Sequence, residues 1–290
     1  EVRLPMKNIP KLSLLEESDT SSFEHAVFLT YGIDLPFFED SILRALLRQQ
    51  TRNIALFADA GHVASQMRHL AEMKKARVGW NHCGKAYSLT SVHHQTAFHP
   101  KMTLLVGEEI QLWVGSGNLE PGGILSNLEI HNLVRMSTNE DIQPDAATLI
   151  VQAWKYIRGI AEKNAAKVVL RQLDQVEETV PWIQTIGEGD SGAYRLVFGP
   201  QDNALKVLVQ AVGGDKVERL VILSPFHDKD FRTLNALRGQ IKPKKVQVLI
   251  QPKMTSMNGR EAEKLASVEF YTLRAPKDRY AHAKIILVES

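Results

Sequence analysis

Two histidines, each followed two positions later by a lysine, are the residues of this sequence best suited to chemistry on a phosphate ester. The first pair, His99 and Lys101, stands in AFHPKMTLLV, and the second, His282 and Lys284, in YAHAKIILV. Each pair opens an apolar stretch, which predicts a β-strand. Because side chains alternate along a strand, each histidine and its lysine should share one face. An imidazole can attack phosphorus, and an ammonium can neutralise charge that builds on the phosphate oxygens.

A glycine-rich run follows the first pair after one expected hairpin near residues 107–109. It reads Gly115-Ser116-Gly117-Asn118. The turn should bring a neighbouring strand back beside His99 and Lys101, so that its end supplies a hydroxyl from Ser116 and an amide from Asn118. An amide that donates to non-bridging oxygens would complete a phosphate site.

The order of expected elements repeats along the chain. A buried strand, a helix at apolar 3.6-residue spacing and a second strand are predicted at residues 26–32, 37–50 and 53–59. The same order returns at residues 220–223, 231–237 and 246–250. A strand–helix–strand order favours parallel pairing in a sheet covered by helices. The chain is therefore expected to contain a diverged internal repeat.

Further elements lie between the two copies of the repeat. Strands are expected at residues 85–92, 98–106, 110–115 and 128–136, helical structure at 146–180, and a loop at 187–192. We predict an α/β protein of two similar β-α-β halves, each a mixed sheet flanked by helices and related by pseudo-twofold symmetry. The halves should occupy residues 1–140 and 191–290, with a helical connector and loop at 141–190.

These motifs and the repeat resemble the phospholipase D superfamily, which uses an HxK…GSxN motif from each of two halves. The matching residues are His99, Lys101, Ser116, Asn118, His282 and Lys284. The likeness covers roughly residues 23–137 and 195–290. It implies that one histidine forms a covalent phosphohistidine while the other protonates the leaving oxygen. By this analogy His99 is the nucleophile and His282 the acid, although the analogy also permits the reverse.

The residues after the first motif resemble bacterial nucleases of the superfamily, including restriction-type ones. Gly122-Gly123 and Asn127-Leu128-Glu129 continue the run as GSGN-LxxGG-xxxN-x-E. In such relatives a carboxylate at this place accepts a hydrogen bond from a catalytic histidine, which fixes the tautomer and the ring orientation. The resemblance therefore gives Glu129 the task of orienting His99.

The sequence departs from the family pattern in two ways. The family aspartate, five positions beyond the lysine, is replaced by Val106 in the first half and by Glu289 in the second. Some relatives, the tyrosyl-DNA phosphodiesterases among them, also lack this aspartate and remain active. A second GSxN would fall beyond Ser290, so the expected second phosphate clamp is incomplete within these residues.

Charge and composition favour a polyanionic partner. The net charge is +2, but residues 195–290 hold 17 Lys/Arg against 10 Asp/Glu, which leaves 18 against 23 for residues 1–194. Phosphates attract such a basic half whatever the base sequence. Substrate contacts are expected from His94, beside the first motif, and from Lys242, Lys244 and Lys245 in the basic KPKK segment, for which a purely solvated role is the alternative.

A metal and a membrane are both unexpected. His82, Cys83, His93 and His94 do not follow the ligand spacing of a structural zinc site. The two lysines and the asparagine would neutralise charge without a metal, so we predict no cofactor. No apolar run approaches the ~18 residues that span a bilayer, and Cys83 is the only cysteine. These features lead us to expect a cytoplasmic protein.

The function predicted from the sequence is a metal-independent phosphodiesterase, most simply a nuclease. The same motif serves lipases, so a phospholipase is the enzymatic alternative. A third reading is a catalytically degenerate domain that binds nucleic acid or a partner in a larger assembly, as Val106 and the incomplete second motif would allow. Further domains, partner subunits or a homodimer are compatible with all three readings.

Overall fold

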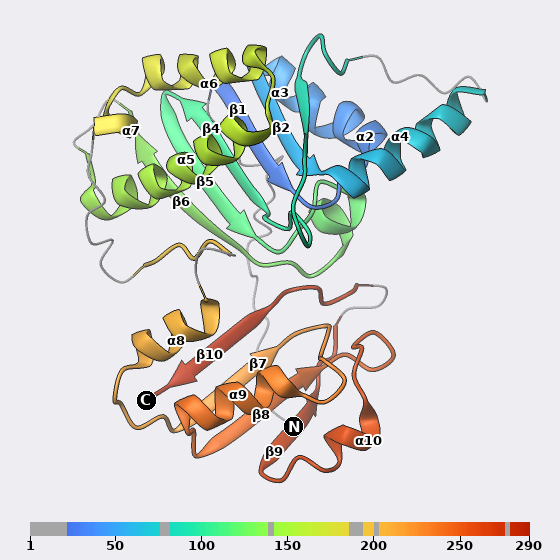
Figure 1. Cartoon of the computed structure of the whole chain (residues 1–290), viewed down its shortest axis with the longest axis vertical. Coiled ribbons are helices and arrows are strands. Elements are labelled where there is room, and N and C mark those ends of the chain that lie inside the picture. The colour runs from blue at the N-terminus through green and yellow to red at the C-terminus, as the bar shows by residue number, and fades with distance from the viewer. Residues whose placement is uncertain (1–21, 76–81, 139–141, 186–193, 200–202, 276–278) are drawn as a thin grey trace.

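The computed structural model describes residues 22–75, 82–138, 142–185, 194–199, 203–275 and 279–290. Within these residues the chain forms two β-sheets, one in each half (Figure 1). The first half builds a sheet of six strands and the second a sheet of four. The loop expected at residues 187–192 lies outside the described residues.

The six-stranded sheet has the order β3-β2-β1-β4-β5-β6. Its strands are β1 (Phe23–Thr30), β2 (Asn53–Asp59), β3 (Ser88–Val92), β4 (Met102–Gly107), β5 (Glu109–Gly115) and β6 (His131–Ser137). The pairs β1–β2 and β2–β3 are parallel, whereas β1–β4, β4–β5 and β5–β6 are antiparallel. The sheet is therefore mixed, as the sequence predicts.

The four-stranded sheet has the order β10-β7-β8-β9. Its strands are β7 (Arg219–Leu223), β8 (Lys245–Ile250), β9 (Val268–Thr272) and β10 (Ile285–Glu289). The pairs β7–β8 and β8–β9 are parallel, and β10 runs antiparallel to β7. This order and these directions match those of β4-β1-β2-β3, so the two halves share one topology and the predicted repeat is confirmed.

Side chains that alternate along the central strands of the first sheet pack into two separate cores, one on each face. Val27 and Leu29 of β1 face one core, while Ala26 and Phe28 face the other. The second core is closed by α2 (Leu35–Phe37), a π-helical turn at Phe38–Leu43, α3 (Arg44–Arg48) and α4 (Ala60–Lys75). The first sheet is thus buried on both faces, which explains why β1 and β2 read as continuous apolar runs.

The segment expected as a helical connector belongs by packing to the first half. It forms α5 (Pro144–Asn164), α6 (Lys167–Thr179) and α7 (Trp182–Thr185). The buried faces of α5 and α6 complete the core that contains Val27 and Leu29, and both helices lie across the sheet in Figure 1. These helices therefore form a layer of the first half rather than a tether between two halves.

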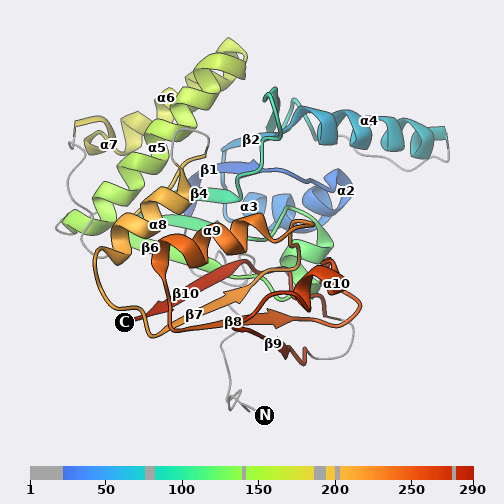
Figure 2. The ribbon, with the colours of Figure 1, turned by 60° about the horizontal axis from the view of Figure 1, so that its bottom comes forward.

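The second sheet packs against helices on one face. The residues Leu220, Ile222, Val246 and Val248 meet apolar side chains of α9 (Arg232–Ile241) and α8 (Ala204–Val212). Figure 2 shows these two helices on the same side of β7 and β8. A short helix, α10 (Gly259–Ala262), contributes Ala262 to the same core. Among the described residues no helix is both long and apolar enough to cross a bilayer.

The packing of α5 gives a stability prediction. Ile157 of α5 is fully buried against the first sheet, whereas Val168 of α6 is 60% exposed. Ile157→Ala should lower the free energy of unfolding by about 2–5 kcal/mol, because it leaves a cavity in a closed core. Val168→Ala should change that free energy by less than about 0.5 kcal/mol. Denaturant unfolding measures both, and equal effects would show that α5 is not part of the core.

Candidate active site

Both His-x-Lys pairs stand directly before a strand rather than inside it. Lys101 immediately precedes β4, and its carbonyl accepts from the N–H of Gly115 at 3.0 Å, which extends the β4–β5 ladder by one residue. Lys284 likewise immediately precedes β10. The sequence placed both pairs within strands, so the expected strand starts are a few residues early. The pairs still lie at corresponding places in the two halves.

Each lysine contacts the histidine of its own pair. Lys101 Nζ lies 3.1 Å from His99 Nδ1 and 3.4 Å from Nε2. Lys284 Nζ lies 2.7 Å from His282 Nε2. An ammonium can only donate, so the ring nitrogen of His282 that faces Lys284 accepts and carries a lone pair in this arrangement.

A short stretch of backbone from the first half binds the second motif. Leu128 N–H donates to the carbonyl of Tyr280 at 2.8 Å, and the Leu128 carbonyl accepts from the N–H groups of His282 and Ala283, each at 3.1 Å. Leu128 and Ala281 form an isolated parallel bridge. This pairing, hereafter the Leu128 clasp, fixes His282 relative to the first half.

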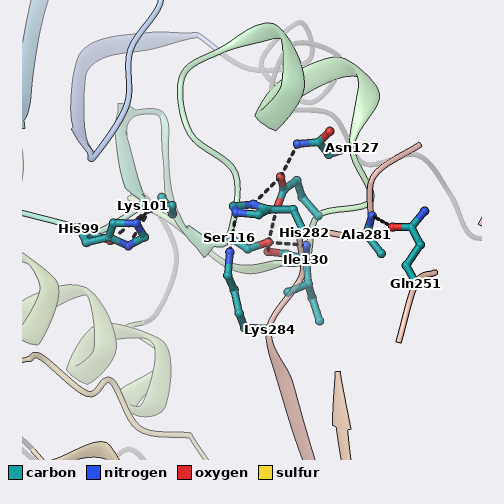
Figure 3. Close-up of polar contacts among 10 residues, drawn as sticks. His99, Lys101, Ser116, Asn127, Ile130, Gln251, Ala281, His282 and Lys284 are labelled. Atoms are coloured by element: carbon teal, nitrogen blue, oxygen red, sulfur yellow. Dashed lines mark hydrogen bonds and ion pairs between the residues drawn. The ribbon is translucent and has the colours of Figure 1, made fainter. Parts of the chain in front are cut away.

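Glu129, the next residue, contacts His282 and not His99. Its Oε1 and Oε2 lie 3.0 and 3.2 Å from His282 Nδ1, and the carboxylate is only 5% exposed (Figure 3). The expectation that Glu129 orients His99 is therefore corrected, because the Leu128 clasp carries Glu129 to the other half's motif. The carboxylate accepts at Nδ1, so Nε2 is the ring nitrogen of His282 that faces Lys284.

Ser116 supports Glu129 instead of facing the phosphate site. Ser116 Oγ donates to Glu129 Oε2 at 2.5 Å and accepts from the N–H of Ile130 at 3.0 Å. Asn127 Nδ2 donates to Glu129 Oε1 at 3.2 Å. Ser116 was expected to present its hydroxyl to the phosphate site. Instead, Ser116 and Asn127 hold the Glu129 carboxylate, which in turn holds His282.

The glycines around this turn are required by close backbone approach. A Cβ on Gly117 would stand 2.4 Å from the carbonyl oxygen of Gly123, and one on Gly123 would stand 2.3 Å from the carbonyl oxygen of Asn118. Real Cβ atoms do not approach backbone so closely, so glycine is needed at both places. The paired glycines of the GSGN and GG segments therefore let the turn fold back on itself beneath the site.

Each motif is also anchored by a side chain at the end of the second strand of its half. Asp59 ends β2, and its Oδ2 accepts from the N–H of Phe98 at 3.0 Å. Gln251 follows β8, and its Oε1 accepts from the N–H of Ala281 at 2.8 Å. Phe98 and Ala281 are the residues directly before the two histidines. The two halves therefore hold their motifs by equivalent hydrogen bonds, which the sequence analysis did not identify.

Burial lowers several pKa values in the site, and neighbouring positive charges add to it for His99 and Lys101. Desolvation, followed by the charges of Lys101 and Lys284, lowers the pKa of His99. Desolvation and the charge of Lys284 lower the pKa of Lys101 to about 8, against the opposing effects of Glu129 and Glu120. Desolvation also lowers the pKa of Lys284. The influence of Lys284 on both first-half residues shows that the two pairs share one electrostatic environment, and Figure 3 shows them side by side.

An aromatic ring from the end of the first strand accompanies each pair. Tyr31 follows β1, and its ring centroid lies 4.6 Å from that of His99, with Lys101 Nζ at 5.6 Å. Phe226 comes shortly after β7, with its ring centroid 6.2 Å from that of His282 and Lys284 Nζ at 6.0 Å. Sequence analysis missed both, although their position just after a buried strand is a usable signal, since such strand ends meet at one edge of a parallel sheet.

A large cavity opens beside the first pair. It has a volume of about 1470 Å³, and His99, Lys101 and His94 are among its lining residues. Basic and aromatic side chains line it further away, namely Arg135, Lys163, Arg195, Tyr156, Tyr194 and Phe198. His94 was expected near the substrate, and the structure places it in this lining with its Nδ1 3.1 Å from Thr96 Oγ1.

The basic KPKK segment lies at the far end of the second sheet. Lys245 begins β8, whereas Gln251, which anchors the second motif, follows the other end of that strand. Lys245 Nζ pairs with Glu269 at 3.0 Å, and Lys244 pairs with Glu218. Lys242 ends α9 in the left-handed region. A strand's length therefore separates the KPKK segment from the second motif, and contact of these three lysines with substrate stays a prediction.

The remaining motif residues are also placed. Among the described residues no hydrogen bond joins Asn118 to either His-x-Lys pair, and its Oδ1 is buried without a hydrogen-bond partner. Val106 is fully buried in the core beneath the first sheet. Glu289 binds Arg219, with Oε2 2.8 Å from Nε. Neither position that replaces the family aspartate therefore contacts a histidine of the site.

The side chains that could bind a metal ion are not grouped together in the described residues. In the ranges that the structure covers, no three His, Cys, Asp or Glu side chains are grouped so as to hold an ion. His93 and His94 are exposed beside the cavity, while the backbone N–H of His82 donates to Glu39 Oε1 at 3.2 Å. The four residues His82, Cys83, His93 and His94 therefore do not form one group of metal ligands.

No protein-family model and no curated protein sequence matches the chain. Several solved structures are similar in fold. Polyphosphate kinase from Porphyromonas gingivalis has a TM-score of 0.46 and 10% identity, covering 95% of this chain and 40% of that one. Yeast tyrosyl-DNA phosphodiesterase has a TM-score of 0.41 and 11% identity, covering 79% and 59%. A variant of the yeast enzyme has a TM-score of 0.45 and 11% identity, covering 81% and 59%.

The chain thus spans about 40 to 60% of the length of the structures it matches. In its α/β repeat and in its two His-x-Lys pairs, the chain resembles the phospholipase D superfamily.

Proposed function

We propose that this chain is a metal-independent phosphodiesterase of the phospholipase D type that cuts nucleic acid through a covalent phosphohistidine. The observation that carries the proposal is that two His–Lys pairs from corresponding places in two halves lie near enough for the charge of Lys284 to lower the pKa of His99, with His282 held by Glu129 of the first half. Two imidazoles and two ammonium groups supply a nucleophile, an acid and charge neutralisation for one phosphodiester.

His99 is assigned the nucleophilic role. Desolvation and the neighbouring positive groups lower its pKa, so it is neutral at physiological pH and keeps a lone pair. Its nitrogen attacks phosphorus, the P–N bond forms, and the bond from phosphorus to the leaving oxygen breaks. Tyr31 packs against the ring at a tilt of 37° and, with Asp59 fixing the preceding backbone, supplies the orientation that a carboxylate supplies for His282.

His282 is assigned the acid role. The buried Glu129 carboxylate accepts from Nδ1 and fixes the ring, so that Nε2, once Lys284 turns to the phosphate, carries the proton that it gives to the leaving oxygen. In the second step water attacks phosphorus, His282 Nε2 takes a proton from that water, and the P–N bond to His99 breaks. Lys101 and Lys284 hold the non-bridging oxygens in both steps, the task that a metal ion performs in other phosphodiesterases.

Nucleic acid is the proposed substrate because of the surroundings of His99. The cavity of about 1470 Å³ is larger than one phosphate needs, and it combines basic with aromatic lining residues. Such a combination suits a phosphate backbone with stacked bases. The GSGN-LxxGG-xxxN-x-E run supports the finer assignment to the bacterial nuclease branch. A phospholipid has no need of several basic groups along one cavity, so a phospholipase is the second choice.

The proposal is tested by cleavage assays in excess EDTA. Single-stranded and plasmid DNA should be cut at an undiminished rate, because lysines rather than a metal neutralise the phosphate. Phosphatidylcholine vesicles should remain intact. The His99→Ala variant should lose at least about 100-fold in rate, as expected for loss of a nucleophile.

Three outcomes would contradict the proposal. Loss of cleavage in EDTA with rescue by magnesium or manganese would reject the mechanism. Hydrolysis of vesicles without cleavage of DNA would support the phospholipase instead. DNA binding without any cleavage would support the reading of a degenerate binding domain.

A second experiment tests the role of Glu129. Glu129→Gln removes the charge that stabilises the imidazolium of His282, so cleavage of an ordinary phosphodiester should slow by at least about 10-fold. A p-nitrophenyl diester has a leaving group that needs no proton, so release of p-nitrophenol in the first turnover, before the phosphohistidine is hydrolysed, should slow by less than about 2-fold. Glu269→Gln, which changes a distant carboxylate paired with Lys245, is the matched control. Equal loss on both substrates would remove Glu129 from the acid's function.

The pH profile tests Lys101. Its pKa is lowered to about 8, so in the free enzyme the ammonium is lost as the pH rises through that value. The ratio kcat/KM should therefore fall above about pH 8. Lys101→Arg should move this fall to higher pH, because a guanidinium keeps its charge. On the acid side, kcat/KM should fall only below the ordinary histidine pKa of 6.5, because that of His99 is lowered. An unchanged alkaline fall in Lys101→Arg would show that another group controls it.

A further inference from the structure

Phe226 is an exposed aromatic ring beside a catalytic pair. It is 56% exposed, whereas Phe23, Phe28, Phe38 and Phe57 are no more than 1% exposed. Its ring centroid lies 6.2 Å from that of His282, and Lys284 Nζ lies 6.0 Å from it. Leaving so much apolar surface in water is unfavourable, so the packing of the core of the second half does not explain why this ring is placed here.

The backbone at Phe226 is held firmly although the ring is exposed. The N–H of Ser256 donates to the Pro225 carbonyl at 2.7 Å, and the N–H of His227 donates to the Ser256 carbonyl at 2.9 Å. Ser224 Oγ donates to the Phe226 carbonyl at 2.8 Å. Hydrogen bonds before, at and after Phe226 therefore fix the backbone from which the ring projects. An ordered, exposed ring loses little conformational entropy when a flat ligand binds to it.

Tyr31, the corresponding ring of the first half, already packs against two other side chains. Tyr31 lies between His99, at 4.6 Å, and His62, at 5.6 Å between ring centroids. His62 is in turn held by Glu120, with Nε2 3.3 Å from Oε1. Tyr31 is thus committed to positioning His99. Phe226 has the same relation to its own pair but keeps an exposed surface, so the two halves use equivalent aromatic positions differently.

We propose that Phe226 is a stacking platform for an unpaired nucleobase on the leaving side of the scissile phosphate. This inference rests on the proposed function and names the substrate form that the second half selects. His282 protonates the leaving oxygen, so the nucleoside that carries this oxygen departs past the His282 side, where Phe226 lies. A base inside a duplex cannot place its face on a protein ring, so the substrate there is single-stranded.

The surroundings of the ring favour a base over an acyl chain. Lys284, His282 and Tyr280 are the groups about the second motif, with Tyr280 5.6 Å from His282 between ring centroids. A nucleobase can stack on one ring while its phosphate remains beside the lysine. An acyl chain needs a continuous apolar surface, which one ring bordered by charged and polar groups does not provide.

The test uses a substrate with one cleavable bond. A short oligothymidylate carries a single phosphodiester between methylphosphonate linkages, and the product that retains the phosphate identifies the leaving side. Two comparison substrates carry an abasic sugar, one on the leaving side of that bond and one on the other side. Steady-state kinetics on all three are measured for the wild type, Phe226→Leu and Phe226→Trp, with Val168→Ala of α6 as an exposed apolar control.

On the intact substrate, Phe226→Leu should raise KM by about 10-fold with a much smaller change in kcat, because stacking on an aromatic ring is lost. Phe226→Trp should restore KM, and Val168→Ala should leave it unchanged. On the substrate with the leaving-side abasic sugar, the wild type and Phe226→Leu should have equal KM. On the other abasic substrate the difference between them should persist.

The inference is overturned if Phe226→Leu retains the wild-type KM, or if the leaving-side abasic sugar does not abolish the difference. The inference is also overturned if the KM difference disappears only on the substrate with the opposite abasic sugar. A further contradiction would be that Phe226→Leu slows hydrolysis of phosphatidylcholine vesicles but not cleavage of DNA. Failure of the proposed function is distinguishable, because the wild type would then cut none of the three oligonucleotides.

Discussion

The Leu128 clasp is the interaction on which the site depends. Its backbone hydrogen bonds join a turn of the first half to the residues around His282. Backbone groups must find partners when they are taken from water, so this pairing is specific in register as well as in place. A shift of one residue would turn Glu129 to the opposite side and remove it from His282. The clasp thereby converts two similar halves into one reaction centre.

Electrostatic balance is the second constraint. Lys101, Lys284 and the two histidines bring positive charge together, and Glu129 is the buried carboxylate in contact with them. Burial lowers the pKa of both Lys101 and Lys284, and for Lys101 the charge of Lys284 adds to this effect. In the proposed function a phosphodiester supplies the missing negative charge, so the site is complementary to that substrate before it arrives.

The sequence predicted the α/β repeat, its mixed sheets and the residues of both His-x-Lys pairs, because strand periodicity and a short motif are local signals. It failed where a role depends on which half a residue faces. Glu129 was assigned to His99 because both lie in the first half, and only the Leu128 clasp shows that it reaches His282. Charge alone suggests substrate contacts for Lys244 and Lys245, and it does not reveal that Glu218 and Glu269 pair with them. The anchors Asp59 and Gln251 come from strand ends distant in sequence from the motifs, so spacing could not connect them.

Those two anchors show how far a duplicated unit has diverged. Asp59 accepts from Phe98 with one oxygen and from the N–H of His62, in the first turn of α4, with the other. A negative charge is favourable at the start of that helix. Gln251 accepts from Ala281 but donates to the carbonyl of Arg279, so it needs both an oxygen and an N–H group. An acid would lose the donor in the second half, and an amide would lose the charge in the first. The two copies, alike in topology, are consequently no longer interchangeable parts, and an ancestral symmetric dimer of one copy would have had to solve both anchoring problems with a single residue.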